Sequence, residues 1–244
     1  MAVTESDIPR ILHLLTCGNV RDEHGMLRWS SNYTFLVSVS EATDKTMAVY
    51  KPQRGERPLW DFPDGTLCYR EVAAYHISAA LGWMLVPPTV LRDGPRGIGS
   101  VQLYIESDPE VNYFTFDDSH IEQLRRMALF DYITNNADRK GGHCLLDDAN
   151  HIWGIDHGIC FHPAPKLRTV IWDFAGQAVP EQLLCDVQRI AEEVDQPSSS
   201  LRRELEPLLA EAEVQALQSR LRRVLHRREF PRPGPGPNYP WPPV

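Results

Sequence analysis

Four short segments carry the side chains that could perform chemistry in this chain. Lys51 ends an apolar, strand-like run, and Glu71 follows it 20 residues later in a helical segment. Asp138 begins the segment Asp-Arg-Lys-Gly-Gly-His, which ends at His143, and Asp156 lies 18 residues after Asp138 in Ile-Asp-His-Gly. The chain has four lysines against 21 arginines, so a lysine at this place suggests a chemical role.

These residue types meet the requirements of phosphoryl transfer from ATP. A lysine neutralises the phosphates and a helix carboxylate holds that lysine in place, which are the roles expected for Lys51 and Glu71. A loop aspartate, here Asp138, orients the attacking hydroxyl, and a second one, Asp156, binds the metal that bridges the phosphates. The glycine that follows, Gly158, is expected to let the chain leave the metal site at an unusual backbone angle.

The sequence resembles the atypical kinases related to phosphatidylinositol 3- and 4-kinases and, more distantly, the HipA-type protein kinases. Their catalytic loop is Asp-Arg-His-x-x-Asn and their metal motif is Ile-Asp-Phe-Gly. The same spacing occurs here from Asp138 to His143 and at Ile155–Gly158. The chain is also similar to a group of actinobacterial kinase-related proteins that share the segments Pro58–Pro63 and Leu81–Trp83.

The resemblance covers residues 15–195 and implies an α+β, two-lobed, protein-kinase-like fold with ATP between the lobes. The N-lobe, residues 1–105, would hold a small antiparallel sheet and a helix, and the C-lobe, residues 106–229, would be mainly helical. The resemblance implies catalytic roles for Lys51 and Asp138, a loop-stabilising role for Arg139, and metal binding by Asp156 and His143. It assigns ATP contacts to Lys51, Glu71, the phosphate-covering loop Ser30, Ser31 and Asn32, and the adenine-facing hinge Gln102, Leu103, Tyr104 and Ile105.

Two positions depart from the family pattern. His143 stands where the family has a metal-binding asparagine, and imidazole binds manganese better than magnesium. We therefore expect Mn²⁺ to be preferred, although either Mn²⁺ or Mg²⁺ fits the family. Lys140 replaces the usual histidine, so Asp138 is the one residue left in this loop to act as the base towards the acceptor hydroxyl. Both departures are also compatible with a degenerate pseudokinase.

The elements that must position these residues follow from local patterns. A helix is predicted over 5–16, strands over 17–21, 33–40 and 46–50, and a helix over 66–81. Two further strands, 86–91 and 100–105, are predicted around the turn Asp93–Pro95. Together these elements give an antiparallel sheet with a helix in the first hundred residues.

The second half is predicted to be helical. Ser119 and Glu122 form a capping-box pattern at the start of one helix, and Asp131 and Asn135 continue its apolar face as expected hydrogen-bonding supports for the catalytic loop. Short strands are predicted over 144–146 and 151–155, and helices over 180–193 and 200–228. The tail, residues 230–244, is proline-rich and expected to be flexible and extended, with docking to a partner as a further possibility.

An arginine cluster ends the last predicted helix. Its members complement the helix dipole and solvate an exposed face, or they form a site for an anionic partner. The sequence leaves both interpretations open. The arginines concerned are Arg220, Arg222, Arg223, Arg227 and Arg228.

Composition limits the possible partners. The chain has 244 residues with 25 basic and 33 acidic side chains, a net charge of −8, which argues against holding nucleic acid or an anionic membrane by bulk charge. Five scattered cysteines without a C-x-x-C pair argue against a disulfide framework and predict a reducing, cytoplasmic location. No secretory signal or membrane span is expected. We expect ATP and a soluble, hydroxyl-bearing acceptor, either a protein or a small molecule, as partners.

Two other functions remain open from the sequence. A pseudokinase would bind nucleotide without turnover and act as a scaffold through its last helix and tail. A metal-dependent phosphoesterase would leave Lys51 and Glu71 unexplained; its ligands would be Asp138, His143, Asp156 and His157.

Overall fold

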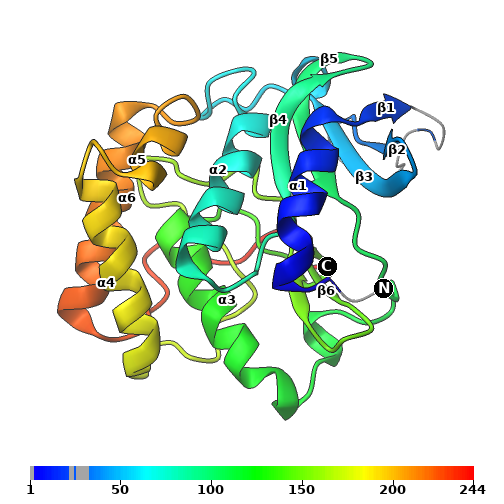
Figure 1. The fold of residues 1–244 in the computed structure, drawn as a ribbon. Coiled ribbons are helices and arrows are strands. Elements are labelled where there is room, and N and C mark those ends of the chain that lie inside the picture. Colours follow the sequence, from blue (N-terminus) through cyan, green and yellow to red (C-terminus); the bar gives the residue numbers. More distant parts are fainter. Residues whose placement is uncertain (1–2, 22–24, 26–32) are drawn as a thin grey trace.

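The structure, a computed structural model, describes residues 3–21, 25 and 33–244. A curled antiparallel sheet with helices against it forms one lobe, and the later helices together with a small two-stranded hairpin form the other (Figure 1). The hydrophobic core forms two clusters, one beneath the sheet and a larger one that joins residues 73–86 to the later helices. The loop Ser30–Asn32, expected to cover the phosphates, lies outside the described residues.

The sheet has the strand order β1-β2-β3-β5-β4, with every neighbouring pair antiparallel. The last hairpin is tighter than predicted: its first strand lies three residues later than 86–91 and its second begins three residues earlier than 100–105, because the turn lies between Gly94 and Gly97 and not at Asp93–Pro95. The strands are β1 (Asn19–Arg21), β2 (Phe35–Glu41), β3 (Asp44–Pro52), β4 (Thr89–Gly94) and β5 (Gly97–Leu103).

The two faces of the sheet have different coverings. Helix α1 (Ile8–Cys17) packs on one face, where the inward-pointing residues of β3 are Ala48 and Tyr50. Since successive side chains along a strand alternate between faces, Lys51 points to the opposite side. That side is where α2 (Leu67–Leu81) and the second lobe lie (Figure 1).

Helix α2 is buried on nearly all sides, which explains its lack of a clear polar stripe. The carboxylate of Glu56 accepts hydrogen bonds from the N–H groups of Leu67 and Cys68, at 3.1 and 2.8 Å, and so caps the first turn. Gly82 ends the helix with φ +71°, a left-handed conformation that suits glycine. Both ends of α2 are therefore fixed, and with them the position of Glu71.

The second lobe contains α3 (Ile121–Thr134), the hairpin β6 (Cys144–Leu146) and β7 (Ile152–Gly154), and α4 (Glu181–Asp195). The expected capping box at Ser119 was wrong, because Asp117 accepts the Ser119 N–H and α3 begins after a 3₁₀ turn.

The single helix expected over 200–228 is two helices, α5 (Ser200–Leu205) and α6 (Glu211–Arg227). Pro207 lacks an N–H and its ring would clash with the preceding turn, so the chain bends there. The carboxylate of Glu213 then accepts the N–H of Ala210 and starts α6. No helix in the described part of the chain is long and apolar enough to cross a membrane.

The proline-rich tail forms no helix or strand, as its composition predicts, but it lies along the second lobe and does not project into solvent. The carbonyl of Asn238 accepts hydrogen bonds from the Thr169 N–H at 3.0 Å and the Trp172 indole at 3.1 Å. Further on, the carbonyl of Pro243 accepts the Gly141 N–H at 2.8 Å. The tail therefore contacts the loop that contains Asp138.

Candidate active site

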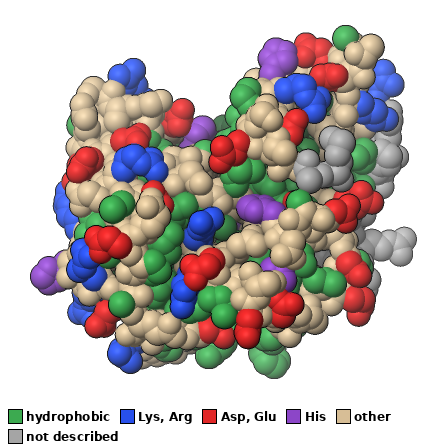
Figure 2. All heavy atoms as spheres, turned by 60° about the horizontal axis from the view of Figure 1, so that its bottom comes forward, with side chains coloured by type: hydrophobic (Ala, Val, Ile, Leu, Met, Phe, Trp, Pro, Cys, Tyr) green, Lys and Arg blue, Asp and Glu red, His purple; other side chains and the backbone are tan. Residues whose placement is uncertain are grey.

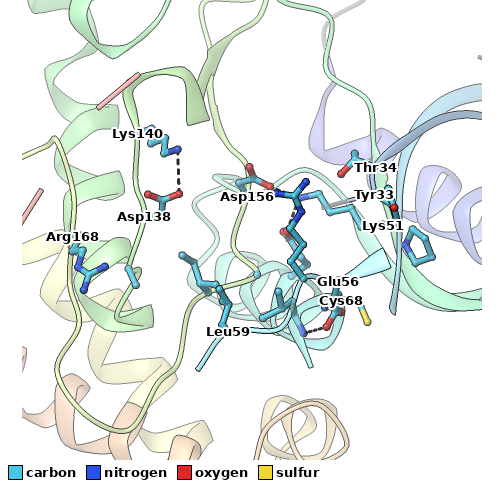
Figure 3. A pocket seen from close by; sticks show the side chains of 17 residues that line it. Tyr33, Thr34, Lys51, Glu56, Leu59, Cys68, Asp138, Lys140, Asp156 and Arg168 are labelled. Carbon is cyan, nitrogen blue, oxygen red and sulfur yellow. Dashed lines mark hydrogen bonds and ion pairs between the residues drawn. The ribbon is translucent and has the colours of Figure 1, made fainter. Parts of the chain in front are cut away.

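A cavity of about 340 Å³ lies between the sheet and the second lobe, and it contains four of the predicted site residues. Lys51 and Glu71 line it from the sheet and α2, and Asp138 and Asp156 line it from the second lobe. Figure 3 shows Asp138, Lys140 and Arg168 on one side, with Lys51 and Asp156 lying together on the other. The structure thus brings together residues that are up to 105 positions apart in the chain.

Lys51 is held by two carboxylates. Its Nζ donates to Glu71 Oε1 and to Asp156 Oδ1, both at 2.5 Å. The other oxygen of Glu71 accepts the N–H of His157 at 3.0 Å. Glu71 therefore connects the lysine on β3 with the loop that carries Asp156, and only 4% of its side chain is exposed.

The charges in this triad stabilise one another. Burial alone would lower the pKa of Lys51, but the nearby Asp156 and Glu71 carboxylates outweigh it and raise that pKa above its usual value. The positive charge of Lys51 holds the pKa of Asp156 well below its usual range. Lys51 and Asp156 are therefore ionised at neutral pH, and a cation paired with the Asp156 and Glu71 carboxylates is already in place in the cleft.

Asp156 has an uncommon backbone conformation, with φ +62°. The expectation that Gly158 supplies the unusual angle was wrong, because the left-handed residue is Asp156 itself. Gly158 serves close packing, since a Cβ there would lie 3.3 Å from the Cβ of Leu67 and 3.6 Å from Glu71 Oε1. The glycine lets α2 approach the loop closely enough for Glu71 to accept the His157 N–H.

Asp138 faces the same cavity from a loop fixed at its start by the Asn136 side chain, whose Oδ1 accepts the Asp138 N–H at 3.0 Å. Its carboxylate has one ion pair, with Lys140 Nζ at 3.6 Å. Burial raises the pKa of Asp138 to about 6, despite the opposing effect of the Lys140 charge. Of the two aspartates, Asp138 is therefore the one suited to exchange a proton near neutral pH.

His143 is placed as a possible metal ligand beside Asp156. Its Nδ1 lies 2.9 Å from the carbonyl oxygen of Asp138, which can only accept, so Nδ1 carries the hydrogen. Burial lowers the pKa of His143 to about 4, so the ring is neutral and Nε2 presents a lone pair. That nitrogen lies 3.3 Å from Asp156 Oδ2.

The separation of these two atoms fits a shared divalent ion. Nitrogen and oxygen ligands bind such ions at about 2.0–2.2 Å, so two neighbouring ligands of one ion lie roughly 3 Å apart. The described residues contain no group of three or more His, Cys, Asp or Glu side chains that could hold an ion by themselves. His143 and Asp156 could therefore supply two ligands to a metal ion whose remaining coordination positions are filled by phosphate or water.

Arg139 does not line the cavity. Its guanidinium is fully buried and donates to Asp131 at 3.0–3.1 Å, to the carbonyls of His143 and Ile155 at 3.1 and 3.0 Å, and to His157 Nε2 at 2.6 Å. Its position fits the loop-stabilising role expected of it, because the guanidinium lies behind the cavity and not in its lining. It is a positioning residue that joins the loops of both aspartates to α3, and the supporting role expected of Asp131 is confirmed.

The expected hinge lies beside the cavity and not in its lining. The side chains of Leu103 and Ile105 belong to the core on the α1 face, while the amide of Gln102 is buried and donates to Thr89 Oγ1 at 2.8 Å. Tyr104 is partly exposed, and its N–H donates to the Met47 carbonyl at 3.0 Å. Adenine contacts by this segment stay a prediction.

Two features near the cavity had no signal in the sequence. One is an ion pair of 2.5 Å between Lys166 and Asp61, which joins the segment after Asp156 to the loop after β3. The other is Arg168, whose side chain lines the cavity on the Asp138 side (Figure 3) and whose N–H donates to the Asn136 carbonyl at 2.9 Å. A pattern of neighbouring residues could not predict either, because both depend on how the loops fold together.

Comparison with known families gives a match that spans most of the chain. Residues 9–212 match the family described as "Phosphatidylinositol 3- and 4-kinase". The chain is also 40% identical to "Protein Rv2133c" of Mycobacterium tuberculosis, over 89% of this chain and 90% of that protein.

Two further similarities are more distant. The "Phosphatidylinositol 4-kinase gamma 4" proteins of Oryza sativa and Arabidopsis thaliana are each 28% identical over 45% of this chain, which spans 23% and 24% of their lengths. Among solved structures, the Helicobacter pylori proinflammatory kinase CtkA aligns with a TM-score of 0.52 and 15% identity, over 88% of this chain and 94% of the other. That likeness confirms the two-lobed, kinase-like fold.

Proposed function

Because the chain belongs to the phosphatidylinositol 3- and 4-kinase family, we propose that it is an ATP- and metal-dependent phosphotransferase acting on a hydroxyl group. The observation that carries the proposal is the Lys51–Glu71–Asp156 triad facing Asp138 across one cavity. Phosphoryl transfer requires these two halves, one to hold the phosphates and one to direct the acceptor.

Lys51 would bind the α- and β-phosphates of ATP. Glu71 keeps its ammonium group pointing into the cavity, so little rearrangement is needed when the nucleotide enters. In the bound state a phosphate oxygen would take the place of Asp156 Oδ1 beside Lys51. Asp156 would then be available as a ligand.

A divalent ion bound by Asp156 and His143 would neutralise charge on the phosphates during transfer. His143 offers only Nε2, because its Nδ1–H is held by the Asp138 carbonyl. This same hydrogen bond fixes the ring relative to the loop that presents the Asp138 carboxylate. An imidazole in this position favours manganese over magnesium.

Asp138 would accept a hydrogen bond from the acceptor hydroxyl and take its proton as the new phosphate ester forms. The pKa of about 6 allows Asp138 to be ionised at neutral pH and still to be a usable base. Lys140, 3.6 Å from this carboxylate, would contact the transferred phosphoryl group from the acceptor side.

ATP turnover tests the proposal without knowledge of the acceptor, since water can serve in its place. Phosphate release should fall by about 10²–10⁴ in Asp138→Asn. Asp118→Asn, an exposed carboxylate on another turn, should leave the rate unchanged. His143→Asn restores the family's residue type and should shift the preference from Mn²⁺ towards Mg²⁺. Equal rates in wild type and Asp138→Asn would contradict the proposal.

The pseudokinase alternative retains one specific observation in its favour, the pairing of Lys140 with Asp138 where the family has a histidine. It predicts ATP binding without any turnover that depends on Asp138. The phosphoesterase alternative is weaker, because Arg139 donates a hydrogen bond to His157 Nε2 at 2.6 Å and so occupies the lone pair that a metal would need. That leaves it without the fourth ligand it requires.

A further inference from the structure

A second cavity, of about 220 Å³, lies at the end of α6, away from the site described above. Arg223 and Arg227 line it from the helix, and Arg232 lines it from the first turn of the tail. Tyr132 of α3 and Phe230 form part of its wall. None of these residues lines the cavity between the lobes. We call these three arginines, Arg223, Arg227 and Arg232, the arginine pocket.

The arginines at this end of the molecule fall into two groups. Arg222 donates to both carboxylate oxygens of Asp195, at 2.8 and 2.9 Å, and Arg228 pairs with Glu181. The arginine pocket differs: within the described residues, none of its three guanidinium groups has an ion pair or side-chain hydrogen bond. The only carboxylate in the lining is that of Glu229.

The lack of counter-charges has an electrostatic cost on the helix. Arg223 and Arg227 are four residues apart, so their like charges lie on neighbouring turns and repel. One turn earlier, Arg220 donates its Nε to the Ile133 carbonyl at 2.7 Å, while its buried Nη2 has no hydrogen-bond partner among the described residues. Four positive groups therefore gather at one end of α6.

A shortage of acidic residues does not explain this arrangement, because the chain has 33 acids against 25 bases. On the face seen in Figure 2, acidic and basic side chains are interspersed, which is the distribution expected where surface charges balance. Within the described residues, the three arginines of the pocket face one lining carboxylate, so an anion from outside the chain would supply the missing counter-charge.

We propose that the arginine pocket binds a small phosphate-bearing molecule. The planar guanidinium group donates two parallel hydrogen bonds to a phosphate, a geometry that the smaller chloride ion cannot use. The hydroxyl of Tyr132 supplies another donor type, and Phe230 offers an apolar surface to an organic substituent. The volume is below that of sites for drug-sized ligands, about 300–1,000 Å³, and so suits a phosphomonoester or a diphosphate.

Titration calorimetry with pyrophosphate as the probe tests this site directly. The catalytic cavity also attracts phosphates, so the titrations are made in the Lys51→Met background. Affinity should fall by at least about tenfold in Arg223→Gln/Arg227→Gln, because each change removes charge-assisted hydrogen bonds. The control variant Arg222→Gln/Arg228→Gln also removes two positive charges from this helix end, but from residues outside the pocket. It should change the affinity for pyrophosphate by less than about twofold.

The two double variants make the result decisive. Equal weakening in both would reduce the effect to general charge attraction and overturn the proposal. Undetectable binding of pyrophosphate in the Lys51→Met background would also overturn it. All four arginines are exposed on the surface, so the variants are expected to fold, and a thermal melt of each one checks this.

The phosphate group could be free or part of a lipid headgroup, and vesicles distinguish these sources. Co-sedimentation is measured with phosphatidylcholine vesicles that contain or lack phosphatidic acid. Pyrophosphate binding without co-sedimentation would identify a soluble ligand. Co-sedimentation that requires phosphatidic acid and is competed by pyrophosphate would identify a headgroup, and either result supports the pocket.

Discussion

The two cavities differ in whether their positive side chains are paired with carboxylates. Between the lobes, Lys51 has two carboxylates within 2.5 Å before any nucleotide is present. In the arginine pocket, Arg223 and Arg227 have no such partner in the described chain. The first site is organised by its own residues, and the second depends on what it binds.

This difference reflects burial. Only 16% of the Lys51 side chain is exposed, and an unpaired ammonium group so deep in the protein would be costly. The pocket arginines are exposed, so water solvates them and their repulsion is tolerable. A catalytic cation must be fixed in position, whereas an exposed arginine can adjust to its ligand.

The largest expected effect comes from the fully buried cation behind the catalytic cleft. Arg139→Ala leaves Asp131 uncompensated and frees two carbonyls, so the free energy of unfolding should fall by about 3–5 kcal/mol. Arg139→Lys should recover little of it, because an ammonium cannot make the same set of hydrogen bonds. Urea denaturation measures both variants, and a loss below about 1 kcal/mol in Arg139→Ala would show that the buried network is not needed.

A smaller effect on stability but a large one on activity is expected at Lys51. Lys51→Met should lower ATP turnover by about 10²–10³, the range for removing one preorganised donor to developing charge. Lys45 lies on the same strand but is exposed, so Lys45→Met is the matched control and should retain turnover. Similar losses in both variants would argue against a special role for Lys51.

The ion pair between Asp61 and Lys166 predicts a pH dependence of stability. Burial would raise the pKa of Asp61, but the hydrogen bond and charge of Lys166 prevail and lower it. Its contribution, about 1 kcal/mol, is therefore present above the unfolded pKa of about 4 and is lost as pH falls through the folded value. The stability difference between wild type and Asp61→Asn should shrink as the pH falls below about 4, and a difference that stays constant as the pH falls would contradict the assignment.

The smallest effect is expected at the arginine pocket without ligand. Arg223→Gln/Arg227→Gln should change the free energy of unfolding by less than about 0.5 kcal/mol, with any change towards higher stability because repulsion is relieved. Arg222→Gln, which loses its pair with Asp195, should lower it by up to about 1 kcal/mol. A loss above about 1 kcal/mol in the pocket variant would reveal a partner and remove the contrast between the cavities.

The sequence predicted the residues whose roles depend on type and spacing. Lys51 and Glu71 meet because a strand end and a helix turn have regular geometry, and the hairpin between Asp138 and Asp156 brings both to one cavity. Periodicity also gave the main helices and strands. Periodicity failed where a single residue interrupts a segment that otherwise favours a helix. Pro207 is the example, because it divides the predicted last helix into α5 and α6.

The rest depends on contacts that leave no pattern. The tail contacts the catalytic loop through the carbonyl of Pro243, and a backbone carbonyl is the same at every position. The burial of Arg139, and the lack of an ion pair at Arg223 within the described part of the chain, depend on which carboxylates come near after folding. Net charge and local sequence contain no information on those distances.

The most direct test of the central claim is a thermal melt with ATP and Mn²⁺. Ligand at about 100 times its dissociation constant should raise Tm by about 5–10 °C. We expect this rise to require both ATP and metal, to disappear in Lys51→Met and Asp156→Asn, and to persist in Arg223→Gln/Arg227→Gln. A rise that persists in Lys51→Met but disappears in the arginine double variant would contradict it, because ATP would then bind at the wrong cavity.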